Sequence, residues 1–87
     1  MAVSKKQMDQ RLVELSALMR NNGVLRNGQR ISYTFALPFV KKKPYQLIIV
    51  VDGRLDKYMT GPVAWGTLCD AVEALEELGI NGQEMRA

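Results

Sequence analysis

The chain has 87 residues and a formal net charge of +3, with 47% apolar and 24% charged residues. This length and composition are those of one small globular domain and exclude a disordered chain. The sequence has no histidine and a single cysteine, Cys69. It therefore lacks the commonest general base and metal ligand, and it cannot form an internal disulfide.

We predict one domain over residues 1–87, with the ends 1–4 and 81–87 frayed. We predict no metal, no cofactor and no enzymatic activity, because no paired carboxylates, phosphate-binding glycine loop or nucleophile motif is present. The start of the chain has no apolar signal core, and no apolar run is long enough to span a bilayer. Together with the lone cysteine, this favours a cytoplasmic protein without membrane contact.

Charge is distributed unevenly along the chain. Residues 1–60 carry eleven bases and four acids, a net charge of +7, whereas residues 61–87 carry one base and five acids, a net charge of −4. No acidic residue lies between Glu14 and Asp52. We therefore expect a molecule with one basic and one acidic side.

A first helix is predicted to begin after Ser4 as N-cap and to end at Gly23, with Val24 folding back on the helix. Its apolar stripe has helical spacing and consists of Met8, Leu12, Leu15 and Met19. Lys5 and Lys6 lie unfavourably for the helix dipole, so either the helix starts later or these lysines serve another purpose.

The run Tyr45–Val51 predicts the central strand, because five consecutive apolar residues indicate burial on both faces. The Asp52-Gly53 pair after it predicts a hairpin turn to a weaker strand, in which Leu55, Lys57 and Met59 would share one face. Before it, alternation predicts a strand whose inward residues are Ile31, Tyr33, Phe35 and Leu37. The segment 24–26 is either a further short strand or a loop.

Gly61-Pro62 predicts the start of a second helix, with proline at its first position. Its apolar stripe is Trp65, Leu68, Val72 and Leu75. Gly79 predicts its end, with Ile80 folding back. The fold class that satisfies these patterns is α+β: a two-layer sandwich of helix, three antiparallel strands (four if 24–26 is a strand) and helix, with both helices on one sheet face.

One sheet face is then left without helices, and it contains either Ile48 and Val50, or Leu47, Ile49 and Val51. A monomer seldom leaves such an apolar set exposed unless it is used. This face is either a surface for a partner or a second copy, or it is covered by loops and long side chains. We take Ile48 and Val50 as its candidate contact residues.

Lys41, Lys42 and Lys43 form the strongest polar motif, a basic loop between Pro38 and Pro44. Three ammonium groups in a loop can contact phosphates or an acidic protein surface, or they can simply keep a hairpin tip soluble. Arg26 and Arg30 lie in the same acid-free stretch and are candidate members of this basic surface.

The predicted order of elements is similar to that of double-stranded-RNA-binding domains, which carry a lysine cluster where their last helix begins. Here that place, residues 61–66, contains no lysine, and the helix then becomes acidic. That function is therefore not predicted.

Two classes of function follow. The first is a small interaction protein, an adaptor or an inhibitor, that covers a partner surface with an acidic margin; small accessory proteins of phages and mobile elements are analogous. The alternative is a nucleic-acid-binding module that uses the basic loop.

Overall fold

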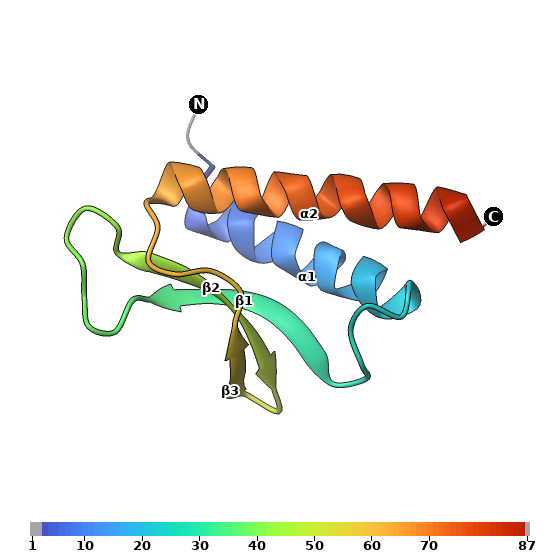
Figure 1. The fold of residues 1–87 in the computed structure, drawn as a ribbon, viewed down its shortest axis with the longest axis horizontal. Helices are drawn as coiled ribbons and strands as arrows, with labels where there is room; N and C mark the ends of the chain where they lie inside the picture. Colours follow the sequence, from blue (N-terminus) through green and yellow to red (C-terminus); the bar gives the residue numbers. More distant parts are fainter. Residues whose placement is uncertain (1–2, 87) are drawn as a thin grey trace.

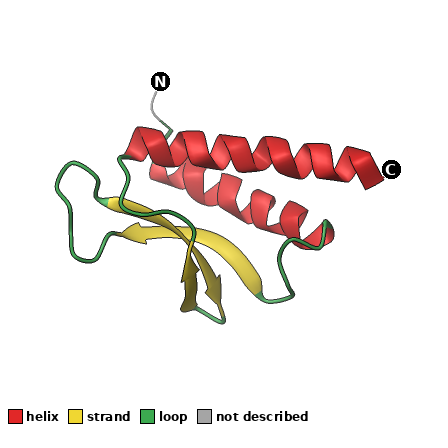
Figure 2. Ribbon diagram, in the orientation of Figure 1, coloured by secondary structure: helices red, strands yellow, loops and turns green. Residues whose placement is uncertain are grey.

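The computed structural model describes the backbone of residues 3–86 and the side chains of residues 3–79. Its elements are α1 (Lys5–Asn21), β1 (Gln29–Phe35), β2 (Tyr45–Val51), β3 (Arg54–Tyr58) and α2 (Trp65–Arg86). The strands form one antiparallel sheet in the order β1-β2-β3, and both helices lie on one side of it (Figure 1; Figure 2). The predicted α+β fold with this order of elements is confirmed.

α1 begins at Lys5 because the preceding residue caps it. The Gln7 N–H donates to the Ser4 hydroxyl (3.1 Å), and the Ser4 N–H donates to the Gln7 side-chain oxygen (2.9 Å). This reciprocal capping box satisfies two backbone donors at the helix start. The helix does not start later, so Lys5 lies in its first turn.

α1 ends in the predicted Schellman motif. Gly23 has a φ of 76° and donates to the Arg20 carbonyl (3.1 Å), while the Val24 N–H donates to the Met19 carbonyl (2.9 Å). Val24 nevertheless stays exposed, and the next residue, Leu25, enters the core instead. Residues 24–26 form a bend and not a strand.

β2 is the central strand, as predicted, and pairs with β1 over all its 7 residues. Asp52 and Gly53 join it to β3, and both have positive φ values (52° and 77°), as a type I′ turn requires. Figure 1 shows β3 and the end of β2 twisting away from the helices.

β3 contains a bulge at Asp56. Ile49 pairs with Lys57 and Val50 pairs with Leu55, which leaves Asp56 without a partner. The extra residue puts Leu55 and Lys57 on opposite faces of the sheet, because paired residues share a face. The single face predicted for them is wrong for this reason.

α2 begins at Trp65, later than predicted, because the chain before it remains extended. Val63 forms a bridge with Tyr45: its N–H donates to the Tyr45 carbonyl (2.7 Å) and its carbonyl accepts from the Tyr45 N–H (3.0 Å). The Thr60 hydroxyl accepts from the Leu47 N–H (3.2 Å) and so holds the start of this segment against β2. The Gly-Pro pair therefore belongs to an extended connection along β2.

Gly79 lies inside α2, which continues to Arg86 rather than ending at the glycine. A Cβ at this position would lie 2.7 Å from Leu18 Cδ2, and the Gly79 carbonyl accepts a hydrogen bond from Asn22 Nδ2 (2.8 Å). Gly79 thus allows α2 to approach α1 closely. The contact predicted for Ile80 lies outside the described side chains.

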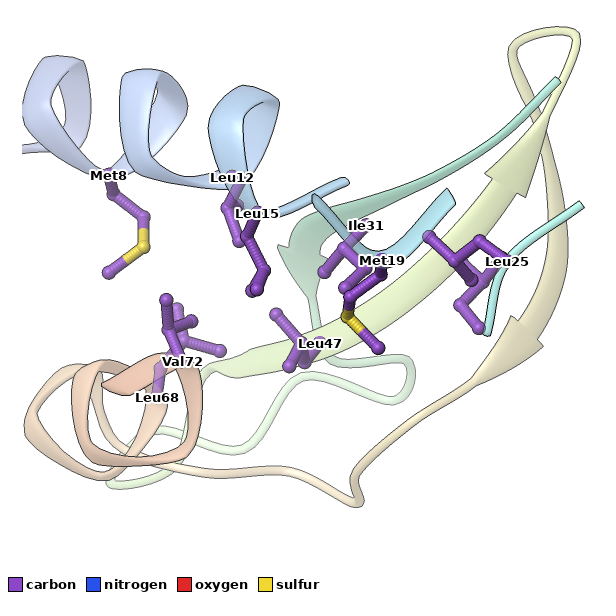
Figure 3. Close-up of a cluster of buried hydrophobic side chains, with 10 residues drawn as sticks. Met8, Leu12, Leu15, Met19, Leu25, Ile31, Leu47, Leu68 and Val72 are labelled. Carbon is purple, nitrogen blue, oxygen red and sulfur yellow. The ribbon is translucent and has the colours of Figure 1, made fainter. Parts of the chain in front are cut away.

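The core lies between the helices and the sheet, as Figure 3 shows. The buried apolar stripe of α1 faces Leu68 and Val72 of α2 and the inner face of β1 and β2, as predicted. The whole core cluster consists of Met8, Leu12, Leu15, Met19, Leu25, Ile31, Leu47, Ile49, Leu68 and Val72.

Candidate binding surface

The structure separates the predicted basic residues into two groups. Lys41, Lys42 and Lys43 are exposed in the loop between β1 and β2. Arg26 and Arg30 lie at the opposite end of β1, whose 7 residues span about 20 Å. The five side chains therefore do not form one continuous basic site.

Ile48 and Val50 lie on the sheet face away from the helices, since Leu47 and Ile49 belong to the core. Both are nonetheless buried, with exposed fractions of 6% and 8%. Each is flanked on both sides by residues of the neighbouring strands, and they are therefore not available as contact residues in this structure. This face was predicted to be either a partner surface or covered within the chain. For Ile48 and Val50 the second alternative holds, because neighbouring side chains cover them.

The exposed apolar atoms of that face come from β3. Tyr58 is paired opposite Ile48 and Leu55 opposite Val50, and both β3 side chains are about half exposed. They shield the central strand while remaining partly in solvent themselves.

A larger apolar surface lies in and beside the β1–β2 loop, where sequence reasoning did not place it. Phe35, Leu37, Phe39 and Val40 have exposed fractions of 53%, 80%, 61% and 37%. The prediction that Phe35 and Leu37 point into the core is wrong. The strand ends at Phe35, so Leu37 belongs to the loop beyond the region that the helices cover.

Aromatic side chains hold this surface against the body of the protein. Phe35 stacks on Tyr45, with ring centroids 5.5 Å apart and an interplanar angle of 23°, and meets Phe39 edge to face at 6.2 Å. Tyr45 in turn contacts Trp65 at 5.0 Å, and the Trp65 indole N–H donates to the Val3 carbonyl (2.8 Å). The predicted core residue Trp65 is half-buried, packed against the core, and links α2 to this cluster.

One lysine lies over these rings, and three more are exposed in the β1–β2 loop. Lys5 Nζ lies 5.7 Å from the centroid of Phe35 and 5.9 Å from that of Tyr45. A cation over a ring face is attracted by the π electrons. This cation–π contact offsets the unfavourable position of Lys5 in the first turn of α1. We call the whole region the aromatic–lysine surface: Lys5, Phe35, Leu37, Phe39, Val40, Lys41, Lys42 and Lys43.

The acidic side of the molecule is α2, where Asp70, Glu73 and Glu77 are exposed. Arg11 of α1 forms a salt bridge with Glu76, and this hydrogen bond raises the pKa of the Arg11 guanidinium. The charge of Arg11 is therefore offset within the helix pair and adds little to the basic surface.

Two side chains with nucleophilic atoms, Cys69 and Ser16, lie outside the aromatic–lysine surface. Burial raises the pKa of the Cys69 thiol, which works against the thiolate that a nucleophile needs. Ser16 is buried and bonded to backbone groups. Within the described residues, no three potential ligands gather to hold a metal ion, and neither helix has the length and apolar character needed to cross a membrane.

Comparison of the chain with known protein families, sequences and structures gives no match. The chain matches no family model, and neither a curated protein nor a solved structure is significantly similar to it. The function must therefore be inferred from the surface itself.

Proposed function

We propose that this protein is a non-enzymatic binding protein, an adaptor or an inhibitor, that covers a protein partner with an acidic margin. The observation that supports this most is the clustering of four exposed apolar side chains beside three lysines in one loop. An apolar centre with a charged rim is the usual anatomy of a protein interface.

The apolar part would supply affinity and the lysines would supply selection of the partner. Burying the exposed portions of four such side chains contributes on the order of 5 kcal/mol before the costs of association. Lysines at the rim raise the association rate for an acidic surface, and that contribution weakens with salt. The proposal places the protein in the cytoplasm, on the grounds given for its lone cysteine.

The test is quantitative affinity capture from extracts of the source organism with paired variants. Replacing Leu37 and Phe39 by Ser should lower recovery of the partner at least tenfold, about 1.4 kcal/mol. Val24→Ser removes an equally exposed apolar residue outside the surface and should leave recovery unchanged. Alanine at Lys41–Lys43 should weaken capture at low salt, whereas Arg26→Ala should not.

Equal recovery with all variants would refute the use of this surface. Loss of recovery with Val24→Ser as well would indicate general unfolding or adhesion rather than a specific contact.

A second candidate is binding of single-stranded nucleic acid, which the exposed rings of Phe35 and Phe39 beside the lysines favour. Bases stack on aromatic side chains, and lysines contact the backbone. Titration of a labelled oligothymidylate should then give binding whose log–log salt slope falls by about 0.7 per lysine removed. No binding at low salt would eliminate this candidate.

A homodimer through the second sheet face is a weaker proposal, because Ile48 and Val50 are buried within one chain. Sedimentation of wild type and Leu55→Lys tests it directly: a dimer through this face would dissociate in the variant.

A further inference from the structure

The outer edge of β1 is closed over its first half by α1. The Ile31 N–H points away from β2 and donates to the buried Ser16 hydroxyl (2.8 Å). The Gln29 carbonyl also points outward and accepts from Arg20 Nη1 (2.8 Å). Side chains of α1 therefore occupy the backbone groups that another strand would need at this end.

The second half of the same edge is open. In an antiparallel pair, the backbone N–H and C=O groups of alternate residues face the partner strand and the outer side. The backbone groups of Tyr33 and Phe35 therefore point outward, as those of Ile31 do. The Ala36 N–H, one residue on, donates toward β2 to the Pro44 carbonyl (2.7 Å), which fits this alternation. Among the described residues, no side chain or loop bonds the outward N–H groups of Tyr33 and Phe35.

Space is present beside these groups. A cavity of about 270 Å³ is lined by Lys5, Tyr33, Thr34, Phe35 and Tyr45, with aromatic walls and one ammonium group. It adjoins the aromatic–lysine surface, with which it shares Lys5 and Phe35, and Phe35 is the last residue of β1 before the β1–β2 loop.

The other edge of the sheet, β3, has a bulge and charged side chains that the Tyr33–Phe35 stretch lacks. It has 5 residues, a bulge at Asp56, and charges at Arg54 and Lys57. Short length, bulges and charges are the features by which proteins protect an edge from further pairing. The Tyr33–Phe35 stretch is also short, but it has no bulge and no charged side chain.

We propose that an extended, acidic segment of a partner protein adds as a fourth strand to β1 at Tyr33–Phe35. This rests on the proposed function and states how the partner is held. Main-chain hydrogen bonds to the edge would supply affinity, and alternate side chains of the segment would enter the aromatic cavity.

Charge selects an acidic segment over a second copy of this chain. Lys5 lines the cavity, and Lys41–Lys43 follow in the adjoining loop. The nearby acid Asp9 opposes this selection in part: burial, and after it the charge of Asp9, raise the pKa of the Tyr33 hydroxyl. Symmetric pairing of two β1 edges would bring two sets of these lysines together, and like charges across an interface are unfavourable. A segment with carboxylates at alternate positions would instead pair with them.

The probe is a synthetic peptide, acetyl-Glu-Val-Glu-Val-Glu-Val-Glu-amide, titrated into the ¹⁵N-labelled full chain. Hydrogen exchange of the Tyr33 and Phe35 amides should slow at least tenfold on binding. A peptide of identical charge with N-methyl groups on alternate residues cannot complete the ladder and should not slow it. Replacing the Phe35 amide by an ester removes one donor and keeps the ring, and should weaken binding about fivefold.

The outcomes separate the two proposals. If an acidic peptide binds and shifts the lysine signals, but Tyr33 and Phe35 exchange as before and the N-methylated peptide binds equally, strand addition is overturned while the binding surface stands. If the peptide does not bind at all while the capture experiment succeeds, strand addition is again overturned. Protection of these amides by oligothymidylate instead of the peptide would overturn it in favour of nucleic acid.

Discussion

Replacing Ser16 by Ala removes a buried side chain that joins the middle of α1 to the edge of β1. The Ser16 hydroxyl donates to the Leu12 carbonyl (2.7 Å) and accepts from the Ile31 N–H (2.8 Å), and all three groups are buried. The Leu12 carbonyl also accepts within the backbone ladder of α1, so its loss is minor. The Ile31 N–H has no such second partner and would be left unsatisfied in the core.

The expected loss follows from that orphaned donor. A buried N–H without a partner costs about 1–3 kcal/mol. Alanine is a better helix former than serine and returns up to about 0.5 kcal/mol. We therefore expect Ser16→Ala to lower the free energy of unfolding by about 1.5 kcal/mol, which corresponds to about 6–12 °C in Tm for a domain of this size.

Urea unfolding followed by the fluorescence of Trp65, the only tryptophan, measures this change. Trp65 is half-buried among aromatic rings, so its emission should respond to unfolding. The denaturation midpoint should fall while the m-value stays constant, and the Ile31 amide should exchange faster than in wild type. Ser32→Ala, at a half-buried serine next to Ile31 in β1, serves as control and should change stability by less than about 0.5 kcal/mol.

A Ser16→Ala variant within about 0.5 kcal/mol of wild type would contradict this reasoning, because that is the range of ordinary surface substitutions. It would mean that the Ile31 donor finds water, and that the first half of the β1 edge is open as well.

Three further changes probe the helix layer. Val72→Asp puts an unpaired charge in the core at a cost of several kcal/mol and should abolish cooperative unfolding, whereas Ala74→Asp on the exposed side of α2 should not. Gly79→Ala should destabilise the fold by about 1 kcal/mol, because the clash with Leu18 outweighs the gain in helix propensity. In a Leu18→Ala background the same change should stabilise the fold. Stabilisation in both backgrounds would refute the close helix contact. Burial raises the pKa of the Cys69 thiol, so iodoacetamide at pH 8 should alkylate it more slowly in the native chain than in urea. Because the folded protein holds the thiol proton more tightly, the contribution of this group to stability is full below the ordinary pKa of cysteine and is lost as pH rises through the raised pKa. Cys69→Ala should remove this part of the decline at high pH, and an unchanged pH profile would contradict it.

Elements defined by local signals were predictable from the sequence. The N-cap at Ser4, the glycine end of α1, the turn at Asp52-Gly53 and the burial of β2 each depend on residues close in the chain. Their geometry matches what these residues prefer: an N-cap side chain, a positive φ, or an apolar run. The helical stripes were equally readable, because a 3.6-residue period leaves one face for the core.

Features set by distant partners were not predictable. Gly79 satisfies the local rule for a helix end, yet its place is fixed by Leu18 and Asn22 of the other helix. Gly61-Pro62 satisfies the rule for a helix start, yet pairing of Val63 with Tyr45 keeps that segment extended. In each case a tertiary contact decides between two conformations that the local sequence allows equally.

The apolar part of the candidate surface was expected on the sheet face, but it lies at the sheet edge and in the loop that holds the predicted lysines, for a reason that applies to any small sheet. A residue on a central strand has neighbours on both sides, so Ile48 is covered by β1 and β3 side chains even without a helix above it. An edge strand has a neighbour on one side, and a loop beyond its end has none. Apolar residues there stay exposed unless another element covers them, and α1 begins with Lys5 above the Phe35 ring. Exposure of Phe35, Leu37 and Phe39 thus follows from how far α1 reaches along β1.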